Sequence, residues 1–136
     1  MFEQIREGSA FMRQALQGYS VRQQALSLNL SNTDTPNYKR MDVGFEEQLR
    51  AKAKLTEPSP MTLTDVRHMP FAGPAAFSPA VSIDRSTTLR RDGNNIDIDQ
   101  EMSKVSQNEI GYNAATQFLS GRFAMLKYVI ADGGGS

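Results

Sequence analysis

The sequence SNTDTPNYKR, at Ser31–Arg40, decides the fold because it abruptly ends a long helical pattern. Asn32 can cap the carbonyl end of a helix, and Pro36 holds the preceding Thr35 in an extended conformation. Asn37 follows, and Asn tolerates the left-handed backbone region better than most residues with a side chain. We therefore predict that the helix stops here, in a turn made by Asn32, Thr35, Pro36, Asn37 and Tyr38.

The segment before this turn, residues 1–31, is predicted to be one long helix. Apolar residues recur in alternating steps of three and four, which places them along one face. Only Ser9 and Gln23 are polar in the series Phe2, Ile5, Ser9, Met12, Leu16, Tyr19, Gln23, Leu26 and Leu30.

Residues 97–131 repeat the same pattern and predict a second long helix, followed by a flexible tail at 132–136. Asp97 is a suitable N-cap, and Asp99 and Glu101 place favourable negative charge in the first turn. The apolar series is Ile98, Met102, Val105, Glu109, Tyr112, Thr116, Leu119, Phe123, Leu126 and Ile130. The fold class expected is mainly α, with the two helices paired as an elongated coiled coil.

The predicted contact between the helices, which we call the seam, uses the large apolar members of both series. These residues are Met12, Leu16, Tyr19, Leu26, Leu30, Tyr112, Leu119, Phe123, Leu126 and Ile130. Gly8, Gly18, Gly111 and Gly121 fall inside the helices but off the seam, at about 1 kcal/mol each relative to Ala. They indicate either exposed positions that tolerate glycine or arms that order fully only against neighbours.

A second apolar stripe lies one residue before each seam, about 100° around the helix. One partner helix cannot cover both faces, so either the central segment folds over this stripe or other subunits do. The centre is rich in proline and poor in large apolar residues, which favours subunit contacts. The predicted interface residues are Phe11, Val21, Leu28, Ile110, Phe118, Met125 and Val129.

The central segment, residues 32–96, is predicted to be an irregular linker because it holds all six prolines of the chain. Phe45–Leu55 has good helix formers, a Glu46–Arg50 pair and Asp42 as an upstream cap, so a short helix is expected there. Ala80–Asp84 is a candidate short strand.

Composition and motifs argue against catalysis, cofactors and metals. The net charge is zero, so nucleic acid or an anionic membrane is a poor partner, and the absence of Cys excludes thiolate chemistry. His68 is the single histidine and stands in a proline-rich stretch without the support a catalytic triad needs. DGNNIDIDQE, at Asp92–Glu101, has Asp97 where a calcium loop requires Gly. A turn leading into a capped helix explains the same residues, and the glycosylation sequon at Asn29 is interpreted as coincidence.

Two stretches resemble the axial proteins of the bacterial flagellum, which build its rod, hook and hook–filament junction. LNLSNTDTPNYKR, at Leu28–Arg40, is similar to their N-terminal signature SNxANxxTPGYKR, with Asn37 in place of the usual Gly. RRDGNNIDIDQEM, at Arg90–Met102, and the short chain resemble the proximal rod proteins of that family. The resemblance covers both arms and the joint on each side, and it leaves Thr56–Leu89 unmatched.

The resemblance implies a non-enzymatic subunit of the basal-body rod that assembles with itself and other rod proteins and transmits torque. It also implies export without a cleaved signal peptide through the flagellar type III apparatus, and a position in the rod crossing the periplasm. The adaptor protein FliE and the export gate at the rod base would be neighbours, with no nucleic acid, small-molecule substrate or membrane span involved. A helical-hairpin adaptor or chaperone that binds a partner helix is the alternative.

Overall fold

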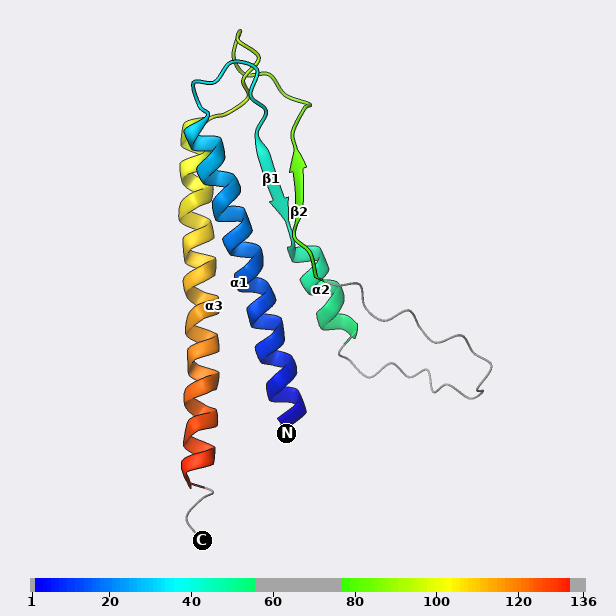
Figure 1. Ribbon diagram of the computed structural model, residues 1–136, viewed down its shortest axis with the longest axis vertical. Coiled ribbons are helices and arrows are strands. Elements are labelled where there is room, and N and C mark those ends of the chain that lie inside the picture. Colours follow the sequence, from blue (N-terminus) through cyan, green and yellow to red (C-terminus); the bar gives the residue numbers. More distant parts are fainter. Residues whose placement is uncertain (1, 56–76, 133–136) are drawn as a thin grey trace, which may run out of the picture.

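The computed structural model describes residues 2–55 and 77–132, which form two long helices, a short helix and a pair of strands. The order is α1 (Phe2–Ser31), β1 (Met41–Gly44), α2 (Glu46–Leu55), β2 (Ala80–Ile83) and α3 (Ile98–Asp132). The molecule is elongated, with α1 and α3 side by side and both termini at the same end (Figure 1). The prediction of long N- and C-terminal helices that pack together is confirmed.

The contact between α1 and α3 includes small and polar residues. Ala115 is buried, and the Asn108 amide of α3 donates to the Tyr19 carbonyl at 3.0 Å and to Gln23 Oε1 at 2.8 Å. A Cβ added to Gly111 would come within 2.6 Å of the Tyr19 ring. Gly111 therefore allows α3 to approach α1 closely at this point.

This contact corrects the predicted seam on α3. Tyr112, Phe123 and Ile130 are exposed, as are Ile98 and Met102, which continue the same apolar series. The helix is rotated so that Glu101, Asn108 and Ala115 face inward instead. The large apolar side chains of α3 consequently lie to the side of the contact, and a heptad seam of large residues does not describe it.

The other predicted seam residues are more enclosed, and which neighbour each one contacts stays a prediction. Leu26 is buried, and the remaining members are half-buried: Met12, Leu16, Tyr19, Leu30, Leu119 and Leu126.

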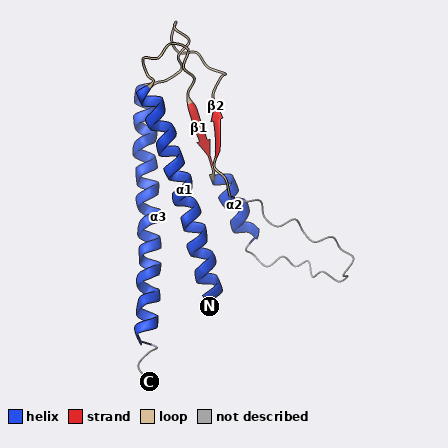
Figure 2. Cartoon of the chain, viewed as in Figure 1, coloured by secondary structure: helices blue, strands red, loops and turns tan. Residues whose placement is uncertain are grey.

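The main apolar core lies on the other side of α1, beneath the central segment. Figure 2 shows the two strands and α2 running along α1, on the side away from α3. The buried cluster consists of Ala15, Ala25, Val43, Phe45 and Leu49, with Phe11, Tyr19, Val21, Met41 and Phe77 packed against it. Phe11 and Val21 were predicted to be covered by other subunits. This is wrong, because both pack against the core of their own chain. The central segment covers them because Val43, Phe45 and Leu49 supply the apolar surface that proline content alone did not reveal.

Phe45 is the centre of this core. Its ring lies over Gly18, where an added Cβ would clash with it, and meets the Tyr19 ring edge-on at a centroid distance of 5.0 Å. The Arg22 guanidinium stacks over the same ring at 4.5 Å and donates to the Val43 carbonyl at 2.7 and 3.0 Å. Gly18 thus serves as a receptacle for an aromatic ring, a role that the exposed-face interpretation of the helical glycines missed.

The strands pair antiparallel, with Met41 opposite Ile83 and Gly44 opposite Ala80. The strand expected near Ala80–Asp84 is present as β2, whereas β1 was not predicted. Asp42 lies within β1 and does not cap α2. Helix α2 begins at Glu46, and the hydrogen bond from the Leu49 N–H to the Phe45 carbonyl closes its first turn.

Glu46 pairs with Arg22 at 2.6 Å and so ties α2 to α1. This contact and nearby N–H groups, working against burial, hold the pKa of Glu46 below its ordinary value.

We predict that Phe45→Ala destabilises the chain by about 3–5 kcal/mol, because the ring is 2% exposed and its loss leaves a cavity against Gly18. Phe118→Ala is the matched control: this ring is 68% exposed, and the expected change is within about 0.5 kcal/mol. Urea unfolding followed by circular dichroism measures both. Equal effects would contradict the assignment of Phe45 to the core.

Candidate subunit interface and the joint that orients it

Asn29 joins the end of α1 to β1 and to the start of α3. Its side chain is fully buried, and its amide donates to the Met41 carbonyl at 2.8 Å and to Glu101 Oε2 at 2.9 Å. Its Oδ1 accepts from the Met41 N–H at 2.9 Å. The side chain thereby pairs with Met41 as a neighbouring strand would, which satisfies the edge of β1 that faces α1.

Asn94 holds the turn that follows α1 from the far side of the sequence. The buried Asn94 amide lies within 2.9–3.1 Å of three carbonyls of this turn, those of Asn32, Thr33 and Thr35. Its Oδ1 accepts from the Ile96 N–H at 2.8 Å. One side chain therefore fixes the end of α1 against the segment that leads into α3.

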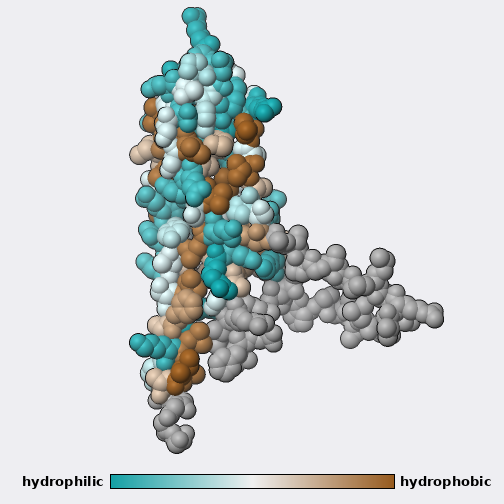
Figure 3. Space-filling model, in the orientation of Figure 1, coloured by the Kyte–Doolittle hydropathy of each residue, from teal (hydrophilic) through white to brown (hydrophobic). Residues whose placement is uncertain are grey.

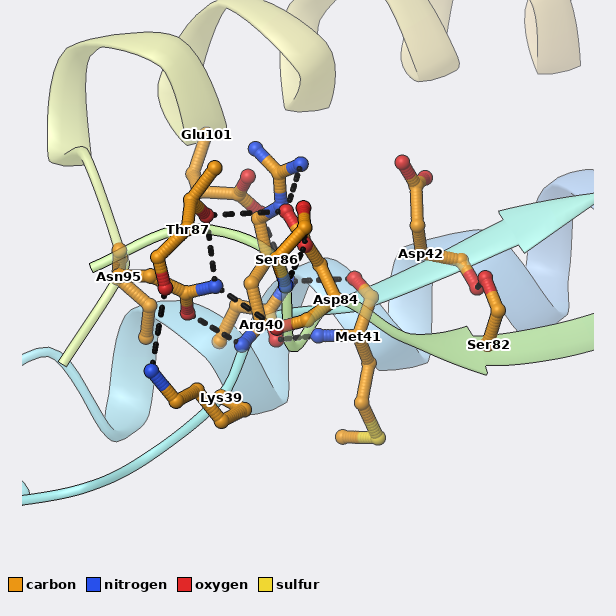
Figure 4. Close-up of polar contacts among 12 residues, drawn as sticks. Lys39, Arg40, Met41, Asp42, Ser82, Asp84, Ser86, Thr87, Asn95 and Glu101 are labelled. Carbon is orange, nitrogen blue, oxygen red and sulfur yellow. Dashed lines mark hydrogen bonds and ion pairs between the residues drawn. The ribbon is translucent and has the colours of Figure 1, made fainter. Parts of the chain in front are cut away.

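Asn95 connects the residue before β1 to the segment after β2, as the close-up in Figure 4 shows. Its Oδ1 accepts from the Arg40 N–H at 2.7 Å, and its amide donates to the Asp84 carbonyl and to Thr87 Oγ1. Arg40 in turn pairs with Asp84 at 3.0 Å. The loop between β2 and α3 is thus held to the strand that follows the turn.

The turn predicted from the sequence has the expected geometry at its decisive positions. Asn37 has a φ of 60°, and the Asn32 amide donates to the Leu28 carbonyl at 2.8 Å. Asn37 N–H donates to the Asp92 carbonyl, so the turn contacts the loop before α3. Gly93, at φ 81°, leaves room there for the Asn37 side chain.

The two residues after the turn hold the same loop. Tyr38 Oη lies 3.4 Å from Asn29 Oδ1, and burial, reinforced by the Glu101 charge, raises the pKa of Tyr38. Lys39 Nζ donates to the Gly93 and Thr87 carbonyls.

The start of α3 is anchored on both sides. Asp97 Oδ1 accepts from the N–H groups of Asp99 and Gln100, which confirms the predicted N-cap. Glu101 is fully buried and is held by Asn29 and by Lys104 at 3.1 Å. These contacts fix how α3 is rotated about its axis, and hence which side chains it presents to the outside.

The side presented is strongly apolar. Four of the predicted interface residues on α3 are at least half exposed, namely Ile110, Phe118, Met125 and Val129, and Leu28 of α1 is exposed as well. Tyr128 and Ile130 of α3 are also exposed, and apolar side chains gather over the lower part of α3 in Figure 3. Soluble monomers seldom leave a row of large apolar side chains uncovered. Subunit contact by these residues stays a prediction.

Other candidate sites find no support in the described parts of the chain. Residues 2–55 and 77–132 hold no group of three His, Asp or Glu side chains placed to bind a metal ion. The described helices include none with the length and apolar character needed to span a bilayer. His68 lies outside the described residues, and the sequon residue Asn29 is buried.

Comparison with known proteins matches nearly the whole chain to one group. The flagellar basal body rod protein FlgB of Bacillus subtilis is 34% identical over 123 residues, which cover 90% of this chain and 92% of that protein. This chain belongs to the FlgB family. Among its other relatives, FlgB of Borrelia hermsii is 32% identical over 82% of the chain, and FlgB of Escherichia coli is 27% identical over 98%. A scan against protein-family models found no match.

The buried asparagines of this FlgB-family chain escaped the sequence analysis. Asn29 was noted only as a sequon, and Asn94 and Asn95 only as part of a rejected calcium loop. A usable signal was present, because Asn29 sits among apolar residues on a helix, where Asn is unfavourable unless its side chain has partners.

We predict that Asn29→Asp destabilises the chain by about 3–5 kcal/mol at neutral pH, because a second buried carboxylate would replace the amide that donates to Glu101. Asn113→Asp is the control, since Asn113 is an exposed residue of α3. Thermal and urea unfolding compare the two variants. A small loss for Asn29→Asp would show that the joint does not depend on the amide.

Acid should loosen the joint at Asp84. The Ser86 hydroxyl and N–H, with Thr87 and Arg40, lower the pKa of Asp84 from 3.8 to about 2. A carboxylate whose folded pKa is depressed contributes stability that is present above pH 3.8 and is lost as the pH falls to about 2. Unfolding measured at pH 6, 4 and 2 should therefore show a smaller acid-induced loss for Asp84→Asn than for the wild type. Parallel losses would contradict this role.

Proposed function

We propose that this chain is a structural subunit of the proximal rod of the flagellar basal body. In this proposal, the exposed side of α3 packs against copies of the same chain and against other rod subunits, and the assembly transmits torque through rigid contacts. The observation that carries the proposal is the row of large apolar side chains left exposed on a helix that the buried asparagine joint holds in a fixed orientation.

Energetics support an assembled state. Each large apolar side chain that moves from water into an interface contributes about 1.5–3 kcal/mol before the costs of association. Many large apolar side chains of α3 are exposed in the single chain, so much of its apolar surface remains available for neighbours. A structural role without catalysis fits this distribution of side chains.

Membership of the FlgB family also supports a proposal for how this chain is exported and where it lies. The chain would cross to its site through the flagellar type III apparatus without signal cleavage and would lie in the rod within the periplasm. At the rod base it would meet the adaptor protein FliE and the export gate. A modest core, centred on five buried residues, suits a chain that folds on arrival.

A helical-hairpin adaptor or chaperone would use the same exposed face differently. It would hold one client helix in a defined complex of low order and would be absent from purified basal bodies. Recovery of the chain in basal bodies favours the rod subunit, and a soluble client complex without such recovery would overturn it.

We predict that Phe118→Asp leaves the monomer folded but prevents assembly, because a charge replaces an exposed apolar contact on α3. Ser120→Asp is the control, as it adds the same charge at an exposed polar position two residues away. Circular dichroism measures folding, and rod content and swimming measure assembly in cells that carry only the variant. Normal rods and swimming with Phe118→Asp would refute this use of the face.

A further inference from the structure

Among the residues that the structure describes, Asp92 and Gly93 form the one Asp-Gly pair. Glycine has no Cβ, so its backbone nitrogen is the least hindered for attack on the carboxyl carbon of the residue before it. A C–N bond then forms, the carboxyl hydroxyl leaves with the proton of the nitrogen as water, and a cyclic succinimide results. Water that adds at the main-chain carbonyl of the ring breaks the original peptide bond. The product is isoaspartate, in which the backbone runs through the side chain and is one carbon longer.

The peptide unit between Asp92 and Gly93 is held at both of its polar atoms. The Asp92 carbonyl accepts from the Asn37 N–H at 2.8 Å, and the Gly93 N–H donates to the Arg90 carbonyl at 3.1 Å. The reacting nitrogen must release the proton that is bonded to Arg90. Because a peptide unit is planar, tilting this nitrogen toward the carboxyl group also moves the carbonyl oxygen away from Asn37. We therefore expect ring closure to break both hydrogen bonds.

The groups on either side of this peptide unit are held as well. Asp92 Oδ1 accepts from the Asn94 N–H at 3.1 Å, and Asp92 Oδ2 lies 3.4 Å from the Arg90 guanidinium. Lys39 Nζ donates to the Gly93 carbonyl at 2.8 Å. Loss of either carboxyl oxygen as water thus costs a further contact.

We propose that Asp92–Gly93 is a site of spontaneous isoaspartate formation that the folded joint keeps closed and that opens when the joint unfolds. A reaction at a protected site waits for local opening, so its rate falls with the fraction of chains that are open. That fraction is kept small by contacts from the turn after α1, through Asn37 and Lys39, as well as from the loop itself. The inference does not rest on the proposed function.

Isoaspartate at residue 92 would add its extra carbon inside a tight turn. Two hydrogen bonds of 3.1 Å close this turn, from the Gly93 N–H to the Arg90 carbonyl and from the Arg90 N–H to the Asn94 carbonyl. The Asn94 amide in turn holds the segment after α1. A chain modified while unfolded is therefore expected to rebuild a weaker joint.

The rate of isoaspartate formation at residue 92 tests the proposal. The folded full-length chain is incubated at neutral pH beside the same chain in concentrated urea and a synthetic peptide of residues 88–97, which contains the pair without the turn after α1. Aspartate and isoaspartate have equal mass, so electron-transfer fragmentation in a mass spectrometer distinguishes them. We expect formation about tenfold more slowly in the folded chain than in the peptide or in urea. Equal rates in the folded chain and the peptide, or a slow rate in urea as well, would overturn the proposal.

Lys39→Met tests whether the turn after α1 closes the site. It removes the donor to the Gly93 carbonyl and keeps the apolar stem of the side chain. Lys127→Met is the control, since Lys127 is exposed on α3, and circular dichroism confirms that both variants are folded. We expect isoaspartate at residue 92 to form about threefold faster in folded Lys39→Met, the effect of one lost hydrogen bond, and at the wild-type rate in the control. A wild-type rate in Lys39→Met would overturn the guarding role of the turn.

The stability of modified chains tests the consequence. Chains aged in urea are separated by chromatography into those with aspartate and those with isoaspartate at residue 92, and both are refolded. The modified chains should unfold at a lower urea concentration. Equal midpoints would contradict the weakening of the joint.

Discussion

The hydrogen bonds of the Asn29 amide hold together the point where α1 ends, β1 begins and α3 starts. A strand beside a helix presents N–H and carbonyl groups to a surface that has no free backbone partners. An amide side chain is the one neutral side chain that offers a donor and an acceptor in the geometry of a peptide group. With a Leu in its place, the Met41 N–H and carbonyl would lose these partners, and the buried Glu101 carboxylate would keep only Lys104. The arrangement of the other elements therefore depends on this residue.

The joint and the apolar surfaces have different tasks. Hydrogen bonds are directional, so Asn29, Asn94 and Asn95 fix the angle and rotation of α3 relative to α1. Apolar contacts are not directional, and a seam of large residues alone would let one helix rotate or slide on the other with little change in buried area. The chain places its directional contacts inside the subunit and leaves its large apolar residues outside, on α3.

The sequence predicted the boundaries of the long helices better than their faces. The Asp97 cap and the left-handed Asn37 depend on local chemistry, and local chemistry is legible in the sequence. The sequence does not reveal which neighbour each apolar stripe faces. A side chain buried by another subunit has the same periodicity as one buried by its own chain. Tyr112 and Phe123 were therefore placed inward and Phe11 outward, and the structure reverses both. Strand β1 was missed because its four residues, Met41–Gly44, are too few to show an alternating pattern.

The polar joint also opposes rotation of α3 in a chain whose buried apolar cluster is small. Five buried residues form the apolar cluster, and they lie between α1 and the central segment, away from α3. Rotation of α3 about its own axis would cost that cluster little, but it would break the bonds of Glu101 to Asn29 and of Asn108 to Tyr19 and Gln23, about 70 to 90 residues apart in sequence. Leaving such buried groups unpaired costs about 1–3 kcal/mol each, and more for the charged Glu101. Resistance to twisting therefore arises from unsatisfied polar groups in the twisted state, and it does not require a large hydrophobic core.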